Sequence, residues 1–261
     1  MQTNSGRHRL LVTAATALLL QACGGPKSSS TSGPSGGPMP TNRMSMDLTV
    51  ESSEPGTAVV RANLNDGRAL ATSYRLDGGD FLEACVIGQC RSMADNDSVF
   101  EPDYIARLNY QPGVDYVVKF DRRQAQDAPN THVTLPPAFT IVTPADRQQV
   151  TDGDVVTVSW APNGAPADVY LLYDADCTFM TGPHGFSFGS LGVDSDRDGQ
   201  QTVDIDRITS FARTNATSPM IRCAIVVTVR HELRGGVDPA FHGGSAVGIV
   251  SRKVTLDYVP R

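Results

Sequence analysis

The chain lacks long apolar runs and an excess of basic side chains, and it has few histidines. Its longest apolar run, 10–20, has about 11 residues, whereas a helix needs about 20 to span the hydrocarbon core of a membrane. The 261 residues hold 22 Lys and Arg, 28 Asp and Glu and 5 His, a net charge of −6. An acidic chain without a basic cluster is a poor candidate for binding nucleic acid or anionic lipid head groups.

The amino terminus has the parts of a secretory signal. Arg7 and Arg9 form a basic lead, the short apolar run follows, and Ala22 supplies a small residue before a cleavage point. We therefore predict a signal peptide over 1–22. Its removal leaves 20 basic and 28 acidic residues, so the mature chain carries a net charge of −8.

The residues LQAC, Leu20–Cys23, resemble the lipobox of bacterial lipoproteins. That resemblance implies cleavage before Cys23, a diacylglycerol thioether on its sulfur and acylation, as by palmitate, of the new amino terminus. Gln21 departs from the family pattern, and an ordinary cleaved signal with Cys23 near the cut is the alternative. Gly24, by resemblance to enteric lipoproteins, implies the outer membrane. We expect a cell-envelope protein held to the membrane by two or three acyl chains.

A segment rich in Gly, Ser and Pro follows and has almost nothing apolar to bury, so we predict a disordered linker over 23–44. Four cysteines come later in the chain, and an even number in an exported protein is typical of disulfides. Of three pairings, spacing favours Cys85 with Cys90 and Cys177 with Cys223. Redox catalysis usually needs two residues between a pair of cysteines rather than four, and zinc is disfavoured because no histidine lies near the close pair.

Short alternating segments bounded by Gly, Pro, Asn and Asp fill the rest of the chain, which is the pattern of antiparallel strands. Pro136 and Pro137 mark a boundary between a first β-sandwich over 45–137 and a second over 138–261. The fold class is therefore all-β. We expect strands at 47–51, 58–64, 70–76, 80–84, 104–110, 114–120 and 131–135, then at 139–142, 154–160, 168–173, 200–206, 223–231 and 246–258.

The stretch Asp154–Tyr173, DVVTVSWAPNGAPADVYLLY, resembles the second and third strands of a fibronectin type III domain. The resemblance implies tandem immunoglobulin-like or fibronectin type III-like sandwiches. It departs from the family in its disulfide and in the long connection 178–199. One short helix is expected at 206–213, with Asp206 as its cap. The expected core contains Trp160, Val156, Val158, Tyr170 and Leu172.

The segment DSDRDG, 194–199, matches the first half of a calcium loop, in which alternate oxygens wrap a hard cation. The residue at the twelfth position is Ile205 rather than an acid, so the motif is incomplete. A solvated acidic turn is the favoured interpretation. A surface calcium site is the alternative, made from Asp194, Asp196, Asp198 and Asp204.

Three further segments resemble functional motifs without completing them. GFSFG places Ser187 in a G-x-S-x-G string but without the strand, turn and helix of a hydrolase, so we interpret it as part of a Gly-rich loop. HELRG starts like a zinc-protease motif at His231, yet Gly235 replaces the second histidine, and we expect His231 at the surface end of a strand. Phe241, in a second Gly-rich loop, is expected to be exposed and could share a rim with the first.

No complete catalytic set emerges, so the sequence favours a non-enzymatic protein with a binding or structural role. Its expected partners are the membrane, through the lipid anchor, and an envelope protein or glycan. No cofactor is expected apart from the calcium candidate. The alternative is a hydrolase or carbohydrate-active accessory protein with a site in 178–199.

Overall fold

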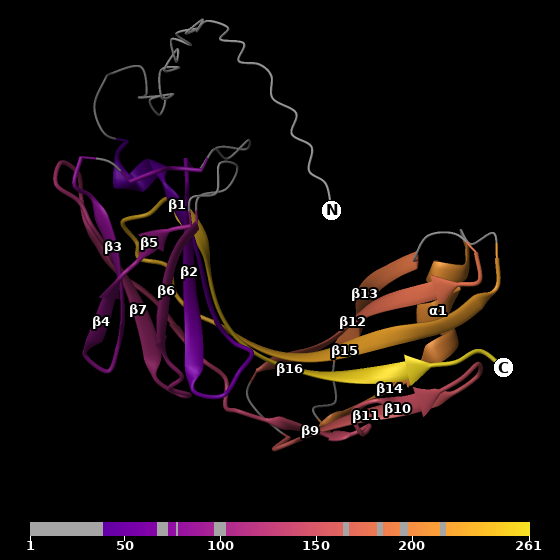
Figure 1. The fold of residues 1–261 in the computed structure, drawn as a ribbon. Helices are drawn as coiled ribbons and strands as arrows, with labels where there is room; N and C mark the ends of the chain where they lie inside the picture. The colour runs from indigo at the N-terminus through magenta and orange to yellow at the C-terminus, as the bar shows by residue number, and fades with distance from the viewer. Residues whose placement is uncertain are drawn as a thin grey trace, which may run out of the picture. The chain divides into compact units, whose positions relative to one another are not determined.

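We describe the protein from a computed structural model, which covers residues 39–66, 73–76, 78–96, 103–163, 167–181, 185–193, 198–214 and 218–261. All of these residues belong to one compact unit. The predicted signal peptide and Cys23 lie outside the described residues, as do Asp194, Asp196 and residues 70–72 of the strand expected at 70–76; residues 74–76 are not in a strand. The chain is all-β, as predicted, with one α-helix in its described part (Figure 1).

The largest sheet of the described residues has nine strands in the order β13-β12-β15-β16-β1-β2-β6-β5, with β10 beside β16. Most neighbours are antiparallel, but β16 runs parallel to both β1 and β10. The strands are β1 (Ser45–Ser52), β2 (Thr57–Asn65), β5 (Ala94–Asp95), β6 (Asp103–Asn109), β10 (Gln148–Val150), β12 (Asp168–Phe179), β13 (Gly185–Val193), β15 (Met220–Arg234) and β16 (Gly243–Tyr258).

A four-stranded sheet, ordered β4-β3-β7-β8, completes the first sandwich. Buried and less buried residues alternate along β2 and β7, so each sheet has one apolar face. The two apolar faces meet in a core that includes Leu48, Val60, Leu82 and Phe120. The strands are β3 (Phe81–Val86), β4 (Gln89–Ser92), β7 (Asp115–Asp121) and β8 (Ala128–Thr134).

The second half of the chain packs β12, β15 and β16 against a three-stranded sheet, ordered β14-β11-β9, and the helix α1 (Ile205–Thr214). Val156, Val158 and Trp160 of β11 are buried, as predicted. The remaining strands are β9 (Thr140–Thr143), β11 (Val155–Ala161) and β14 (Gln200–Asp204).

The prediction of which β12 side chains face inward was wrong by one position. Leu171 and Tyr173 are buried, whereas Tyr170 and Leu172 are half-buried on the opposite face. Both faces of this strand carry apolar residues, so the sequence alternation does not identify the inner one.

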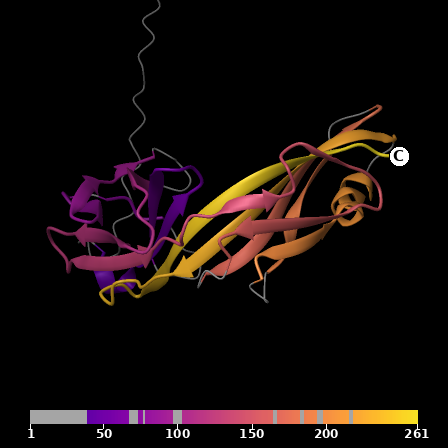
Figure 2. The same cartoon turned by 90° about the horizontal axis from the view of Figure 1, so that it is seen from below.

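Strand pairing continues across the expected boundary between residues 137 and 138. β16 pairs in parallel with β1 along 243–250 and antiparallel with β15 along 247–258, so residues 247–250 have neighbours on both sides. β15 and β16 are the longest strands of the described chain, and both figures of the fold show β16 running from one half into the other (Figures 1 and 2). The two predicted sandwiches therefore share a sheet.

Both predicted disulfides are confirmed. Cys85 and Cys90 lie opposite each other in the hairpin of β3 and β4, and Cys177 lies opposite Cys223 in β12 and β15. The sequence did not predict β4, β5 or β10, which are short, or β13, whose glycines made it look like a loop.

The predicted helix is confirmed as α1, but its cap is different. Asp204, rather than Asp206, accepts hydrogen bonds at its Oδ1 from the backbone N–H groups of Asp206 (2.9 Å) and Arg207 (3.4 Å). This is the N-cap arrangement, in which a carboxylate satisfies unpaired donors of the first turn. Asp206 instead accepts a bond from the backbone N–H of Gly153 (3.1 Å).

The last residues of the expected linker pack on the first sandwich through Arg122. Its buried guanidinium forms an ion pair with Asp80 (2.9 Å), and Nη1 donates to the carbonyl of Met39 (2.6 Å) and to the hydroxyl of Thr41 (3.1 Å). A short 3-10 helix, η1 (Thr41–Arg43), follows at once. These bonds attach residues 39–41 to the first sandwich.

Candidate interaction surface

β13 carries the most exposed aromatic side chains of the described residues. Phe186 and Phe188 are 72% and 81% exposed, respectively. They occupy alternate positions and so project from the same face of the strand. This arrangement reverses the usual one for a half-buried strand, in which the large apolar side chains face the core.

Large rings on the neighbouring strand β12 explain why the inner face of β13 carries small residues at 185, 187 and 189. A Cβ atom added at Gly185 would lie 2.6 Å from the ring of Phe179, and one added at Gly189 would lie 3.1 Å from the ring of Tyr173. A side chain at either glycine would have to displace a buried aromatic ring. The inner positions are therefore restricted to small residues, which leaves the phenylalanines facing outward.

Ser187 sits between these glycines on the same inner face. Its side chain is buried, at 6% exposure, and its Oγ donates to the hydroxyl of Tyr173 over 3.4 Å. The G-x-S-x-G string lies within a strand, so the expected Gly-rich loop at this position is wrong. Its glycines and serine serve packing under β13, and Ser187 does not stand on a turn between a strand and a helix.

Two carboxylates lie beside the exposed aromatic rings. Asp174 of β12 is opposite Phe188, and Asp176 is opposite Phe186. All four side chains are exposed. We call these four residues the β13 surface. Exposed rings beside carboxylates can pack against apolar groups of a partner, while the carboxylates can accept hydrogen bonds from it.

β13 also forms the edge of its sheet, because β12 is its one strand partner among the described residues. None of its nine residues is charged or proline. The other edge strands are better protected: β4, β5, β9 and β14 have two to five residues, and β8 contains Pro129. Proteins usually block edge strands with charge, proline or short length, since an open edge pairs readily with another chain. β13 lacks all three features.

A second exposed apolar side chain is held in an unfavourable backbone conformation. Ile87, at the tip of the hairpin of β3 and β4, has a φ of 46° and is 63% exposed. A β-branched residue rarely adopts this left-handed conformation, and Asn or Gly is usual at such a turn. The adjacent Cys85–Cys90 disulfide closes this hairpin and helps to hold the strained turn.

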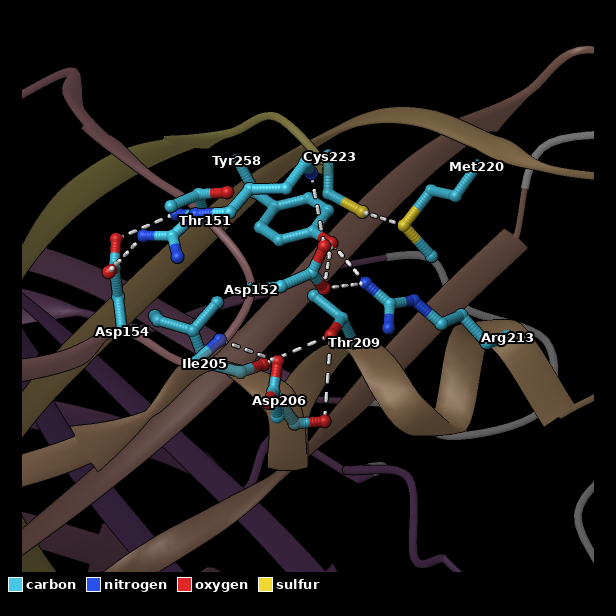
Figure 3. A network of polar contacts seen from close by, with 12 residues as sticks. Thr151, Asp152, Asp154, Ile205, Asp206, Thr209, Arg213, Met220, Cys223 and Tyr258 are labelled. Carbon is cyan, nitrogen blue, oxygen red and sulfur yellow. Dashed lines mark hydrogen bonds and ion pairs between the residues drawn. The ribbon is translucent and has the colours of Figure 1, made fainter.

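Figure 3 shows a polar network at the carboxyl end of β16. Asp152 accepts hydrogen bonds from Arg213 of α1, from the hydroxyl of Tyr258 (2.6 Å) and from the backbone N–H of Arg261 (3.1 Å). The bonds from Arg213 and Tyr258 lower the pKa of Asp152 to about 2, and burial raises the pKa of Tyr258 to about 12. Asp152 therefore stays ionised near neutral pH and links the helix and the chain end to the β10–β11 turn.

The calcium candidates are only partly described. Asp198 uses its carboxylate to accept bonds from the backbone N–H (3.1 Å) and the side-chain amide (3.1 Å) of Gln200, and Asp204 caps α1. Asp194 and Asp196 lie outside the described residues. The bonds of Asp198 and Asp204 are those of an acidic turn followed by a capped helix.

Two expected surface residues are buried. Phe241 is 6% exposed and stacks on Phe120 of β7, with the ring centroids 5.9 Å apart. His231 is 1% exposed and lies within β15, where it stacks on Phe139 at 4.0 Å. Both predictions were wrong because glycines and charged residues nearby in sequence made Phe241 look like part of a loop and His231 look like the end of a strand. Phe241 therefore packs in the first sandwich and shares no rim with β13.

No protein-family model matches the chain, and no curated protein matches it in sequence. Among the described residues, no helix is both long enough and apolar enough to cross a membrane.

Proposed function

We propose that this chain is a lipid-anchored cell-envelope protein with a binding role, and that the β13 surface is its binding site. In this proposal 1–22 is a signal peptide, Cys23 carries the lipid, and the linker presents two immunoglobulin-like or fibronectin type III-like modules, 45–137 and 138–261, which share a sheet through β1 and β16. Gly24 favours the outer membrane.

One observation supports the binding role most strongly. The longest edge strand without charge or proline in the described chain also exposes two phenylalanines side by side. An edge strand of this kind offers main-chain hydrogen bonds to an incoming strand, and its outward side chains provide selectivity. The partner is therefore expected to be a protein that adds a strand to β13. Ser187 is buried against Tyr173, which does not favour it as a hydrolase nucleophile in the described part of 178–199.

Fractionation of cells tests the anchor. The Cys23→Ser variant should move from the membrane fraction to the soluble fraction, because the thioether can no longer form. Gln21→Leu is the matched control: it brings the lipobox closer to the family pattern and should keep the protein in the membrane. If Cys23→Ser stays in the membrane fraction at the wild-type level, the anchor is excluded.

Site-specific photo-cross-linking tests the binding surface. The photoreactive residue p-benzoylphenylalanine is placed at Phe188 in the full chain and activated in intact cells. Val155, which is 65% exposed on β11, is the matched control position because it is an exposed apolar residue in a different sheet from β13. We expect a discrete protein adduct from position 188 and none from 155. Absence of an adduct at 188, or equal adducts at both positions, would exclude β13 as the binding edge.

A further inference from the structure

The centre of β13 is a palindrome. Residues 185–189 read GFSFG, with Ser187 in the middle. Antiparallel pairing of two such strands about a two-fold axis at Ser187 sets Phe186 of each copy opposite Phe188 of the other. The same register sets Gly185 opposite Gly189. Two-fold interfaces use one self-complementary patch on both subunits, and a palindromic edge strand meets that requirement.

We propose that β13 binds β13 of a second copy of this chain, so that the sheet continues through a symmetric dimer. This inference rests on the proposed function, which assigns β13 as the binding edge, and it names the partner. Both cross-strand pairs on the outer face are then phenylalanine pairs, which are among the favourable pairs in antiparallel sheets. On the inner face only glycine and serine meet, so the core below needs no rearrangement. The two-fold pairing uses the edge of both copies and therefore stops at a dimer.

The distribution of charge favours a second copy. A chain with a net charge of −8 after signal cleavage associates with itself most readily through a neutral segment, and β13 carries no charge. Asp174 and Asp176 lie on β12, one strand behind the edge. In the dimer they are separated from their counterparts by three strand spacings, about 14 Å. That exceeds the Debye length of about 8 Å at physiological salt, so the repulsion is screened.

The segment that pairs between the two copies is short, so we expect the dimer to form only where the copies are concentrated. The carbonyl of Leu191 accepts a bond from Gln201 (3.3 Å), and among the described residues the two-fold register pairs only 185–189. With about 200 Å² per side chain, four phenylalanines at three-quarters exposure present roughly 600 Å², which is the upper limit of the aromatic area that pairing can bury. Specific interfaces bury about 1,200 Å² or more, so this dimer is weak in dilute solution. Confinement of anchored copies to a membrane raises their effective concentration and favours pairing.

Register-specific disulfide cross-linking in membranes tests the dimer. The full chain carries either Phe186→Cys, Phe188→Cys or both, and each is oxidised in the membrane fraction. In the proposed register, position 186 faces position 188, so the double variant should give at least tenfold more cross-linked dimer than either single variant. The unmodified chain measures any background from Cys23. Protease resistance equal to that of the unmodified chain shows that each variant is folded.

The matched control is the double variant Val155→Cys with Thr157→Cys, two exposed alternate positions on β11, which is not an edge strand. The inference is overturned if the single variants cross-link as well as the double variant, or if the β13 and β11 double variants behave alike. If β13 does not cross-link to itself while position 188 photo-cross-links to a different protein, the dimer is excluded and the binding function stands. If neither experiment gives an adduct, both proposals fail.

Discussion

His231 is buried without a hydrogen-bond partner among the described residues, and this makes the stability of the protein depend on pH. Neither of its ring nitrogens has a partner in this part of the chain, and the ring contacts Phe139 at 4.0 Å and the edge of Trp160 at 6.2 Å. Burial lowers the pKa of His231 from 6.5 to about 4. Between about pH 4 and pH 6.5 the imidazole is therefore neutral in the folded protein, whereas an exposed histidine is protonated.

The sign and the size of the effect follow from this shift. The unfolded chain binds a proton at His231 below pH 6.5, whereas the folded chain binds it only near pH 4, so acid favours unfolding. The contribution of His231 to stability is complete above pH 6.5, falls as the pH drops, and is lost at about pH 4. At about 1.4 kcal/mol per pH unit, the total loss is about 3 kcal/mol, of which about 2 kcal/mol is lost by pH 5.

The perturbation is His231→Phe, which keeps an aromatic ring against Phe139 and removes the titrating group. Urea unfolding at pH 7 and pH 5, followed by the fluorescence of Trp160, measures the free energy of unfolding; Trp160 is the one tryptophan of the chain. The wild type should lose about 2 kcal/mol more than the variant between the two pH values. His242→Phe, at an exposed position, should behave like the wild type. An unchanged pH dependence in His231→Phe would refute the reasoning.

Three other predictions concern the turn at Ile87, the ion pair between Arg122 and Asp80, and the acidic segment 194–199. Ile87→Asn should raise the free energy of unfolding by about 1 kcal/mol, because Asn tolerates the left-handed conformation; a loss of stability would contradict this. Arg122→Met should cost about 3–5 kcal/mol, because it leaves the buried carboxylate of Asp80 without its ion-pair partner, and the double variant with Asp80→Leu should recover most of that loss in the same unfolding assay. Millimolar calcium should leave the melting temperature unchanged; a rise that disappears in Asp198→Asn would instead establish a calcium site.

The sequence predicted the parts of the fold that depend on local patterns. Alternation identified most strands, cysteine spacing gave both disulfides, and the buried positions of β11 up to Trp160 were correct. The shared sheet could not be predicted, because β1 and β16 are separated by about 190 residues and run parallel. A parallel pair needs no hairpin turn, so neither strand carries a sequence signal that identifies its partner.

The candidate surface escaped prediction for a different physical reason. Residues 185–189 alternate between small and large side chains, which is a strand pattern, but the inner face carries the small ones. Pattern analysis assumes that the large apolar face is the buried one, and on that assumption Phe186 and Phe188 belong in the core. The rings of Phe179 and Tyr173 already fill the space below β13, and they come from a strand whose own inner face the sequence left ambiguous. The neighbouring strand β12 thus determines which face of β13 is exposed. The exposed aromatic edge arises from packing between strands rather than from the sequence of β13 alone.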